Sequence, residues 1–220
     1  FSIPKLTMVC AGLNANDVVA VNAFVYRLNR LLLTFMEHSH HEDLLLFPRI
    51  RRFFPNLNTD ADKEHERAHE QVQQMQDALD TYANSDKASV AATTMLDVVN
   101  VVLPVWGPEV EEHLRNEEST ITVVARKYLP VEYQMEIVRE LFAMTSAEKW
   151  RQIMPFVVNN LPHNVWKVRY VKAFLWANPL RAQEIGLNLY HSVDSITWLM
   201  LTREVPQIIP RGAAGHKRIY

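Results

Sequence analysis

Three pairs of side chains that can donate to a metal lie four residues apart in this sequence: His38 with Glu42, His65 with His69, and His113 with Glu117. On a helix, residues four apart lie one turn above each other on the same face, so each pair could direct both side chains at one point. Imidazole and carboxylate donors together suit iron, manganese or zinc. Three helices that carry these pairs would build a metal centre inside a bundle, as in the di-iron carboxylate proteins.

Each pair has a simpler interpretation, because His and Glu on one helix face also occur where that face meets solvent. The first pair lies in HSHHEDLLLFP, where a purely apolar run, Leu44–Phe47, follows it directly. A solvent-facing cluster does not need such a run, and we expect the leucines to anchor this helix in a bundle core. Next to Glu117, Glu118 is an alternative ligand, but the four-residue spacing from His113 favours Glu117.

The second ring nitrogen of a ligating histidine usually needs an acceptor of its own. The nearby carboxylates that could fill this role are Glu37, Asp43, Glu66 and Glu70. For each of them alone, an ordinary solvated helix charge is the competing interpretation. His40 and His41 are expected beside the site or in solvent, because spacing pairs Glu42 with His38.

The elements that would position these pairs are helices throughout. Glycine is scarce, with 5 in 220 residues, no Asn-Gly or Asp-Gly hairpin signal occurs, and apolar residues recur at helical steps. We expect an all-α fold, with Thr59 or Asp60 as the cap of the second helix. Helices are predicted over about 16–48, 60–83, 88–128 (bent at Pro104 and Pro108), 131–144 and 147–159, followed by a tail broken by prolines.

Composition limits the class of protein. Apolar residues make up 48% of the chain, and the formal net charge of -2 gives no basic field for nucleic acid or an anionic membrane. No stretch approaches the roughly 18 uncharged apolar residues of a membrane span. The single cysteine, Cys10, excludes an internal disulfide framework and indicates a reducing compartment, most simply a cytoplasmic one. The start lacks the pattern of a signal peptide and an initiator Met, so further residues could precede Phe1.

The motifs around the three pairs are similar to those of a known family. HSHHEDLLLFPRI resembles the HxxxEExxLFPxL signature of the hemerythrin-like (HHE cation-binding) family, with His38 and Glu42 in the ligand positions. KEHERAHEQV resembles its HxxxH motif, and EEHLRNEESTI resembles its last motif, often HLxxE. The three motifs occur in the family's order, and the resemblance covers roughly Leu6 to Lys127.

The resemblance implies a hemerythrin-like four-helix bundle over residues 6–128, with residues 129–220 as an additional C-terminal helical extension packed on it. It also implies a non-haem pair of irons, bridged by two carboxylates. The ligands would be His38, Glu42, His65, His69, His113 and Glu117. Members of the family carry oxygen, sense oxygen or iron, or handle nitric oxide.

The sequence departs from the family pattern at one ligand. The family places a fifth histidine ahead of the HxxxE helix, and none of the first 37 residues is histidine. That ligand would come from residues before Phe1, or another donor such as Cys10 would replace it, or the position is vacant.

Three functions remain open at this point. The first is a di-iron protein that binds or activates dioxygen, the second a di-iron oxidase or oxygenase acting on a small organic substrate, and the third a metal- or oxygen-sensing module. The partner would be dioxygen or another small ligand, with neither nucleic acid nor membrane, and the oligomeric state is open. A carrier needs only a small sealed pocket, whereas an enzyme needs a cavity that admits its substrate.

Overall fold

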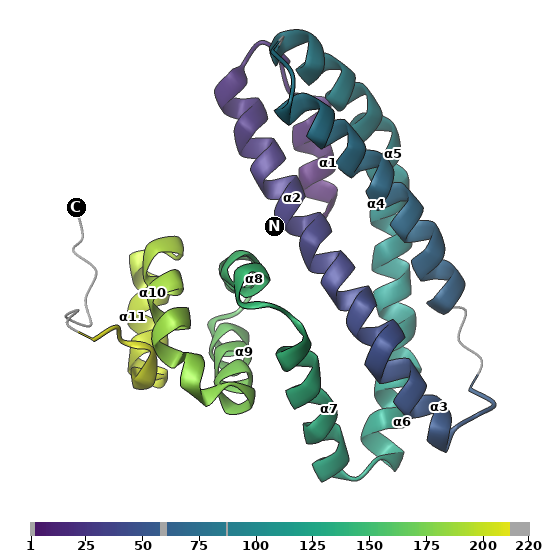
Figure 1. Cartoon of the computed structure of the whole chain (residues 1–220), viewed down its shortest axis with the longest axis vertical. Coiled ribbons are helices and arrows are strands. Elements are labelled where there is room, and N and C mark those ends of the chain that lie inside the picture. The colour runs from purple at the N-terminus through teal and green to yellow at the C-terminus, as the bar shows by residue number, and fades with distance from the viewer. Residues whose placement is uncertain (1–2, 58–60, 87, 212–220) are drawn as a thin grey trace. The chain divides into compact units, whose positions relative to one another are not determined.

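The computed structural model describes residues 3–57, 61–86 and 88–211, and all regular structure in these ranges is helical (Figure 1). The all-α prediction is therefore confirmed. Contacts divide the chain into two compact units, Phe1–Pro130 and Val131–Tyr220, beside the predicted boundary at residue 128. The packing of residues 129–220 on the bundle stays a prediction.

The described part of the first unit contains three long helices, α2, α4 and α5, and several short ones. Its elements are α1 (Ile3–Ala11), α2 (Val18–His41), the π-helix η1 (Glu42–Leu46), α3 (Phe47–Phe53), α4 (Ala61–Ala83), α5 (Ala88–Ser119) and α6 (Ile121–Tyr128). The sequence did not predict α1, which is too short for a clear periodic pattern. Asp17 caps α2, because its Oδ1 accepts a hydrogen bond from the Ala20 N–H at 3.0 Å. The predicted caps Thr59 and Asp60 lie outside the described residues.

Four helices of this unit share one apolar core. Residues of α2 and α5 at three- and four-residue steps turn inward, because that spacing keeps them on one face. The core includes Leu6 and Cys10 of α1, Val21, Phe24, Leu28, Leu32 and Phe35 of α2, Val72, Met75 and Leu79 of α4, and Met95, Val99, Leu103 and Trp106 of α5. The stripe ends at Phe35 on α2 and at Val110 on α5, and His38 and His113 follow three residues later. The metal-donor pairs thus continue the inward face of the core helices.

The helix predicted over 88–128 is divided into two, α5 and α6, with the break at Thr120. Pro104 and Pro108 lie inside α5, and the bend predicted at them stays a prediction. The Thr120 hydroxyl donates to the Asn116 carbonyl at 2.6 Å, and such a bond to the preceding turn competes with the regular helix ladder.

Two stretches, Val18–Phe53 and Ser89–Tyr128, are long and apolar enough to cross a membrane by length and composition alone. This is weak support for a span, since core helices of a bundle meet the same test, and both stretches supply much of the core described above. The absence of a membrane partner stays a prediction.

The second unit is built from short helices. Its elements are α7 (Val131–Met144), α8 (Ala147–Asn160), α9 (Asn164–Ala177), η2 (Pro179–Arg181), α10 (Ala182–Ser192), α11 (Ser195–Glu204) and η3 (Pro206–Ile208). Trp150 of α8 and Phe174 of α9 meet edge to face at 4.8 Å in its core, where Trp198 of α11 is also fully buried. Asp194 caps α11 through hydrogen bonds from the Ile196 and Thr197 N–H groups.

A close backbone contact joins α10 to η3. A Cβ atom on Gly186 would lie 1.7 Å from the carbonyl oxygen of Ile208 and 2.6 Å from its carbonyl carbon. Both atoms belong to the backbone, so no side-chain rotation can relieve the overlap. Only glycine therefore allows this approach.

We expect Gly186→Ala to destabilise the second unit by at least about 3 kcal/mol, the upper part of the range for overpacked cores. Denaturant unfolding followed by tryptophan fluorescence measures this unit, since Trp150, Trp166, Trp176 and Trp198 lie in it and only Trp106 lies outside. Gly12→Ala is the matched control, because its Cβ would meet nothing closer than 3.8 Å. An unchanged midpoint for Gly186→Ala would contradict the contact.

Candidate metal centre

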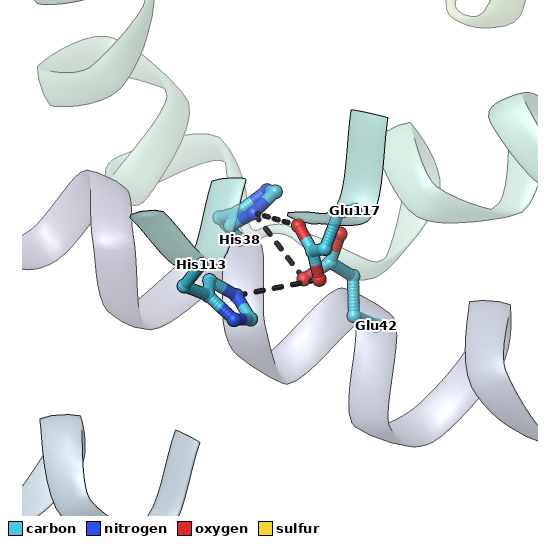
Figure 2. A group of neighbouring side chains, drawn as sticks. All are labelled: His38, Glu42, His113 and Glu117. Atoms are coloured by element: carbon cyan, nitrogen blue, oxygen red, sulfur yellow. Dashed lines mark ion pairs between the residues drawn. The ribbon is translucent and has the colours of Figure 1, made fainter. Parts of the chain in front are cut away.

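Four of the six predicted ligands form one tight group. His38, Glu42, His113 and Glu117 each offer one ligand atom, and these atoms all lie within 4.8 Å of one another (Figure 2). His38 Nε2 is 3.2 Å from Glu42 Oε2 and 3.5 Å from Glu117 Oε2. His113 Nε2 is 3.3 Å from Glu117 Oε1. The group therefore joins the end of α2 and the first residue of η1 to the last turns of α5.

Several donor atoms of this group are buried without a hydrogen-bond partner. They are His38 Nε2, Glu42 Oε2 and Glu117 Oε1. The His38 side chain is 39% exposed, yet its Nε2 is covered, so the ring turns this nitrogen inward. Buried polar atoms without partners are costly, and converging bare nitrogen and oxygen atoms are what a cation would satisfy. The donor set therefore fits a metal ion.

His65 of α4 points at the same group. Its Nε2 lies 2.9 Å from His113 Nε2 and 3.5 Å from Glu42 Oε2. The Nδ1 of His65 is 2.7 Å from Asp43, and the Nδ1 of His113 is 2.7 Å from Glu64. A carboxylate at Nδ1 holds a proton there, which is the usual arrangement behind a histidine whose Nε2 binds a metal. In the metal-free chain the two Nε2 atoms share a hydrogen bond, so one of them carries a proton.

Of the acceptors predicted for these rings, Asp43 is seen in that role, at His65. Glu64 was not predicted, although it directly precedes His65 in the sequence. The signal that would have identified it is the register of α4 against α5, because Glu64 reaches across to His113 rather than to its own helix.

His69 lies apart from the group. Its Nε2 is 2.7 Å from the Ser39 hydroxyl, and its ring stacks on His65 at 6.0 Å. The hydroxyl also lies 3.2 Å from the Phe35 and Met36 carbonyls, so it donates to the backbone and accepts from the His69 Nε2–H. Burial, followed by the nearby His65, lowers the pKa of His69. His69 as a ligand stays a prediction.

The π-helix η1 positions Glu42 and Asp43 at the site. The Phe47 N–H bonds to the Glu42 carbonyl, five residues back, so the turn is one residue wider than in an α-helix. The wider turn brings Glu42, Asp43 and Phe47 to the side facing α4, where Phe47 stacks on His65 at 5.6 Å. Such turns occur frequently at functional sites.

The anchoring role expected of the leucines was wrong. Leu44 is 58% exposed, and Leu45 and Leu46 are only half-buried, whereas Phe47 and Ile50 are buried. The wider turn accounts for this, since it shifts the buried face by one residue relative to regular helical periodicity.

The two alternative donors considered from the sequence lie elsewhere. Glu118 is exposed, whereas Glu117 is 8% exposed and faces the group. Cys10 is buried in the apolar core, and burial raises the pKa of its thiol to about 11. A protonated thiol is a poor ligand. Among the described residues that could hold a metal, the group includes no donor from α1.

The electrostatics of the centre reflect its crowding. Burial alone would lower the pKa of His65, but its contacts with Glu42 and Asp43 raise it to about 9. Burial raises the pKa of Glu42. Burial acts in the same direction on Glu117, but its contacts with His38 and His113 outweigh it and lower the pKa of Glu117. Without a metal, protons must therefore reside among these groups.

A family model for the hemerythrin HHE cation-binding domain matches residues 6–123, more than half of the chain. The chain belongs to the hemerythrin HHE cation-binding domain family. The matched span of this hemerythrin-like domain includes all six predicted ligands. No match was found among curated proteins, and none among solved structures. The resemblance inferred from the motifs is confirmed, and with it a metal-binding helical bundle.

The two neighbouring glutamates allow a matched test of the centre. We expect Glu117→Gln to lower metal content at least tenfold, because a neutral amide replaces a buried carboxylate among the donor atoms. Glu118→Gln, a change of the same kind on the exposed side, should leave metal content unchanged. Elemental analysis of both variants after identical loading measures this, and the reverse order would assign the ligand to Glu118.

The raised pKa of His65 predicts how the metal-free protein responds to pH. Its folded-state pKa of about 9 exceeds the ordinary value of 6.5, so its stabilisation is complete below about pH 6.5 and is lost as pH rises through 9. The loss is up to about 3 kcal/mol, at about 1.4 kcal/mol for each pKa unit. Denaturant titrations of chelator-treated protein at several pH values would measure it.

Asp43→Asn provides the control for this dependence, because it removes one of the two carboxylates that hold the proton on His65. The variant should lose less stability between pH 6.5 and 9 than the unmodified chain. Equal slopes would show that His65 is not the titrating group.

Proposed function

We propose that this hemerythrin-like domain holds a pair of non-haem irons and binds or activates dioxygen there. The observation that carries the proposal is the convergence of buried atoms without hydrogen-bond partners, from His38, Glu42 and Glu117, with two imidazoles backed by carboxylates. His38, Glu42, His113 and Glu117 would hold the metal, together with His65, whose Nε2 points at the same group.

The chain's own residues prepare this site in three ways. Asp43 and Glu64 orient His65 and His113 and strengthen them as donors. Phe47 stacks on His65 and covers it from solvent. The Nε2 of His69 would join the ligands only by giving up its hydrogen bond to Ser39.

Iron is the metal that the family resemblance favours, although manganese and zinc suit the same donors. Bound iron would supply the electrons for a reaction with dioxygen. A second candidate, a di-iron oxidase or oxygenase acting on a small organic molecule, is favoured by the cleft beside His113 that is described below.

The number of histidines supports activation over reversible carriage. The family pattern has five histidines and two carboxylates as ligands. In residues 1–220 the motifs supply four histidines at ligand positions, and one of these, His69, is hydrogen-bonded to Ser39. If no histidine from residues before Phe1 completes the set, fewer protein donors leave more places on the metals for exchangeable ligands, and open places distinguish catalytic metal sites from closed ones.

We therefore expect the iron-loaded, reduced protein to be oxidised by dioxygen without returning to its reduced state when dioxygen is removed. Rapid mixing of anaerobically reduced protein with dioxygen, followed by absorbance, measures this. Iron content per chain, measured beforehand, should approach two. A spectrum that returns on removing dioxygen would identify a carrier, and protein that retains no iron would contradict the centre itself.

A further inference from the structure

A cleft of about 360 Å³ lies between α4 and α5, beside the metal centre. Phe35, Ala68 and Val110 form its apolar part, and Glu64, Arg67 and Glu109 line its polar part. His113 also lines it, so one wall of the cleft is a side chain of the metal-binding group. A volume of this size falls within the range of pockets that bind small organic molecules.

The cleft follows from the side chains that face each other at this level of the bundle. On α4 the inward positions run from His65 through Ala68 to Val72 and Met75, and all four are buried. Ala68 is the smallest of them, and it lies one turn from the metal-donor layer. The cleft therefore results from the packing of two helices around the small side chain of Ala68, and not from the position of a loop.

The charges around the cleft favour some ligands over others. The lining has three carboxylates, Glu64, Glu109 and Glu112, against one guanidinium, Arg67. Arg67 is already committed, because its Nη2 lies 2.6 Å from Glu109 Oε1. Gln71 also donates to Glu109, at 3.0 Å. Among the described lining residues no cation is free to pair with an anionic ligand, and the carboxylates would repel it. A neutral ligand is not repelled, and a cationic one is attracted.

We infer that this cleft is a binding site for a small organic molecule with an apolar body and a neutral or positively charged polar group. The apolar body would contact Phe35, Ala68 and Val110, and the polar group would lie near Glu109. A bound molecule would lie against His113 and Glu64. Glu64 accepts the hydrogen bond from the Nδ1–H of His113. Its role as a substrate rests on the proposed function, but its binding does not.

Three probes of similar size and different charge test the site: benzyl alcohol, benzylamine and benzoate. We expect the intact chain to bind the first two with a Kd at least tenfold lower than that of benzoate, measured by calorimetry near pH 7 with and without iron. Ala68→Trp should abolish binding, because the indole fills the apolar part. Ala83→Trp, at the exposed end of the same helix, should bind as the unmodified chain does.

Glu109→Gln keeps the test valid even if the tryptophan variant unfolds. It removes the carboxylate that occupies Arg67, so the preference for benzylamine over benzoate should fall at least tenfold. The inference is overturned if no probe binds, if all three bind equally, or if binding survives in a folded Ala68→Trp variant. Iron content is measured on the same samples, so a chain that binds probes but no iron would contradict only the proposed function.

Discussion

Two hydrogen bonds between carboxylates and imidazoles fix the orientation on which the centre depends. Asp43 holds the Nδ1 of His65 and Glu64 holds the Nδ1 of His113, so both Nε2 atoms face inward, 2.9 Å apart. Asp43 and Glu64 come from η1 and α4, and each reaches a histidine on another helix. The bonds therefore tie α4 to both of its neighbours as well as aiming the donors. Charged groups held by such bonds cost less to bury than free ones, which allows a polar layer to continue an apolar core.

That layer is stabilised only in part without a cation. Three donor atoms lack hydrogen-bond partners, and the pKa of His65 rises because neighbouring carboxylates favour its protonated form. A proton shared among these groups replaces some of the charge that a metal would supply, but one proton cannot satisfy donors on three helices. Metal binding must displace the proton, which couples metal affinity to pH and metal content to folding. The buried donors thus lower the stability of the metal-free chain, and a bound metal would restore it.

The sequence predicted those parts of the structure that depend on spacing within one helix. The four-residue spacing brought His38 together with Glu42 and His113 together with Glu117, and it placed Glu117 inside and Glu118 outside. On α4 His65 points at this group, whereas His69 lies apart from it. The sequence could not predict the π-helix, because a continuous apolar run has no period from which a wider turn could be read. It also missed Glu64, and it gave no sign that Ser39 would hold His69, since both contacts depend on how separate helices align. Short-range periodicity carries no information on that alignment.

The cleft beside the centre is best understood from what an empty space costs. Cavities in a packed interior destabilise a protein by roughly 24 cal/mol for each Å³, so unfilled space is normally removed by larger side chains. The apolar core of the bundle follows this rule, since Val72, Met75 and Trp106 are fully buried members of one cluster. One turn closer to the metal-donor layer, Ala68 leaves space where a larger residue would fill it. Because solvent reaches an open cleft, the cost here is smaller than for a sealed cavity, and a ligand that displaces this water from the apolar wall gains the corresponding burial energy. The part of α4 that carries His65 thus also leaves, at Ala68, space for a second molecule beside the donor group.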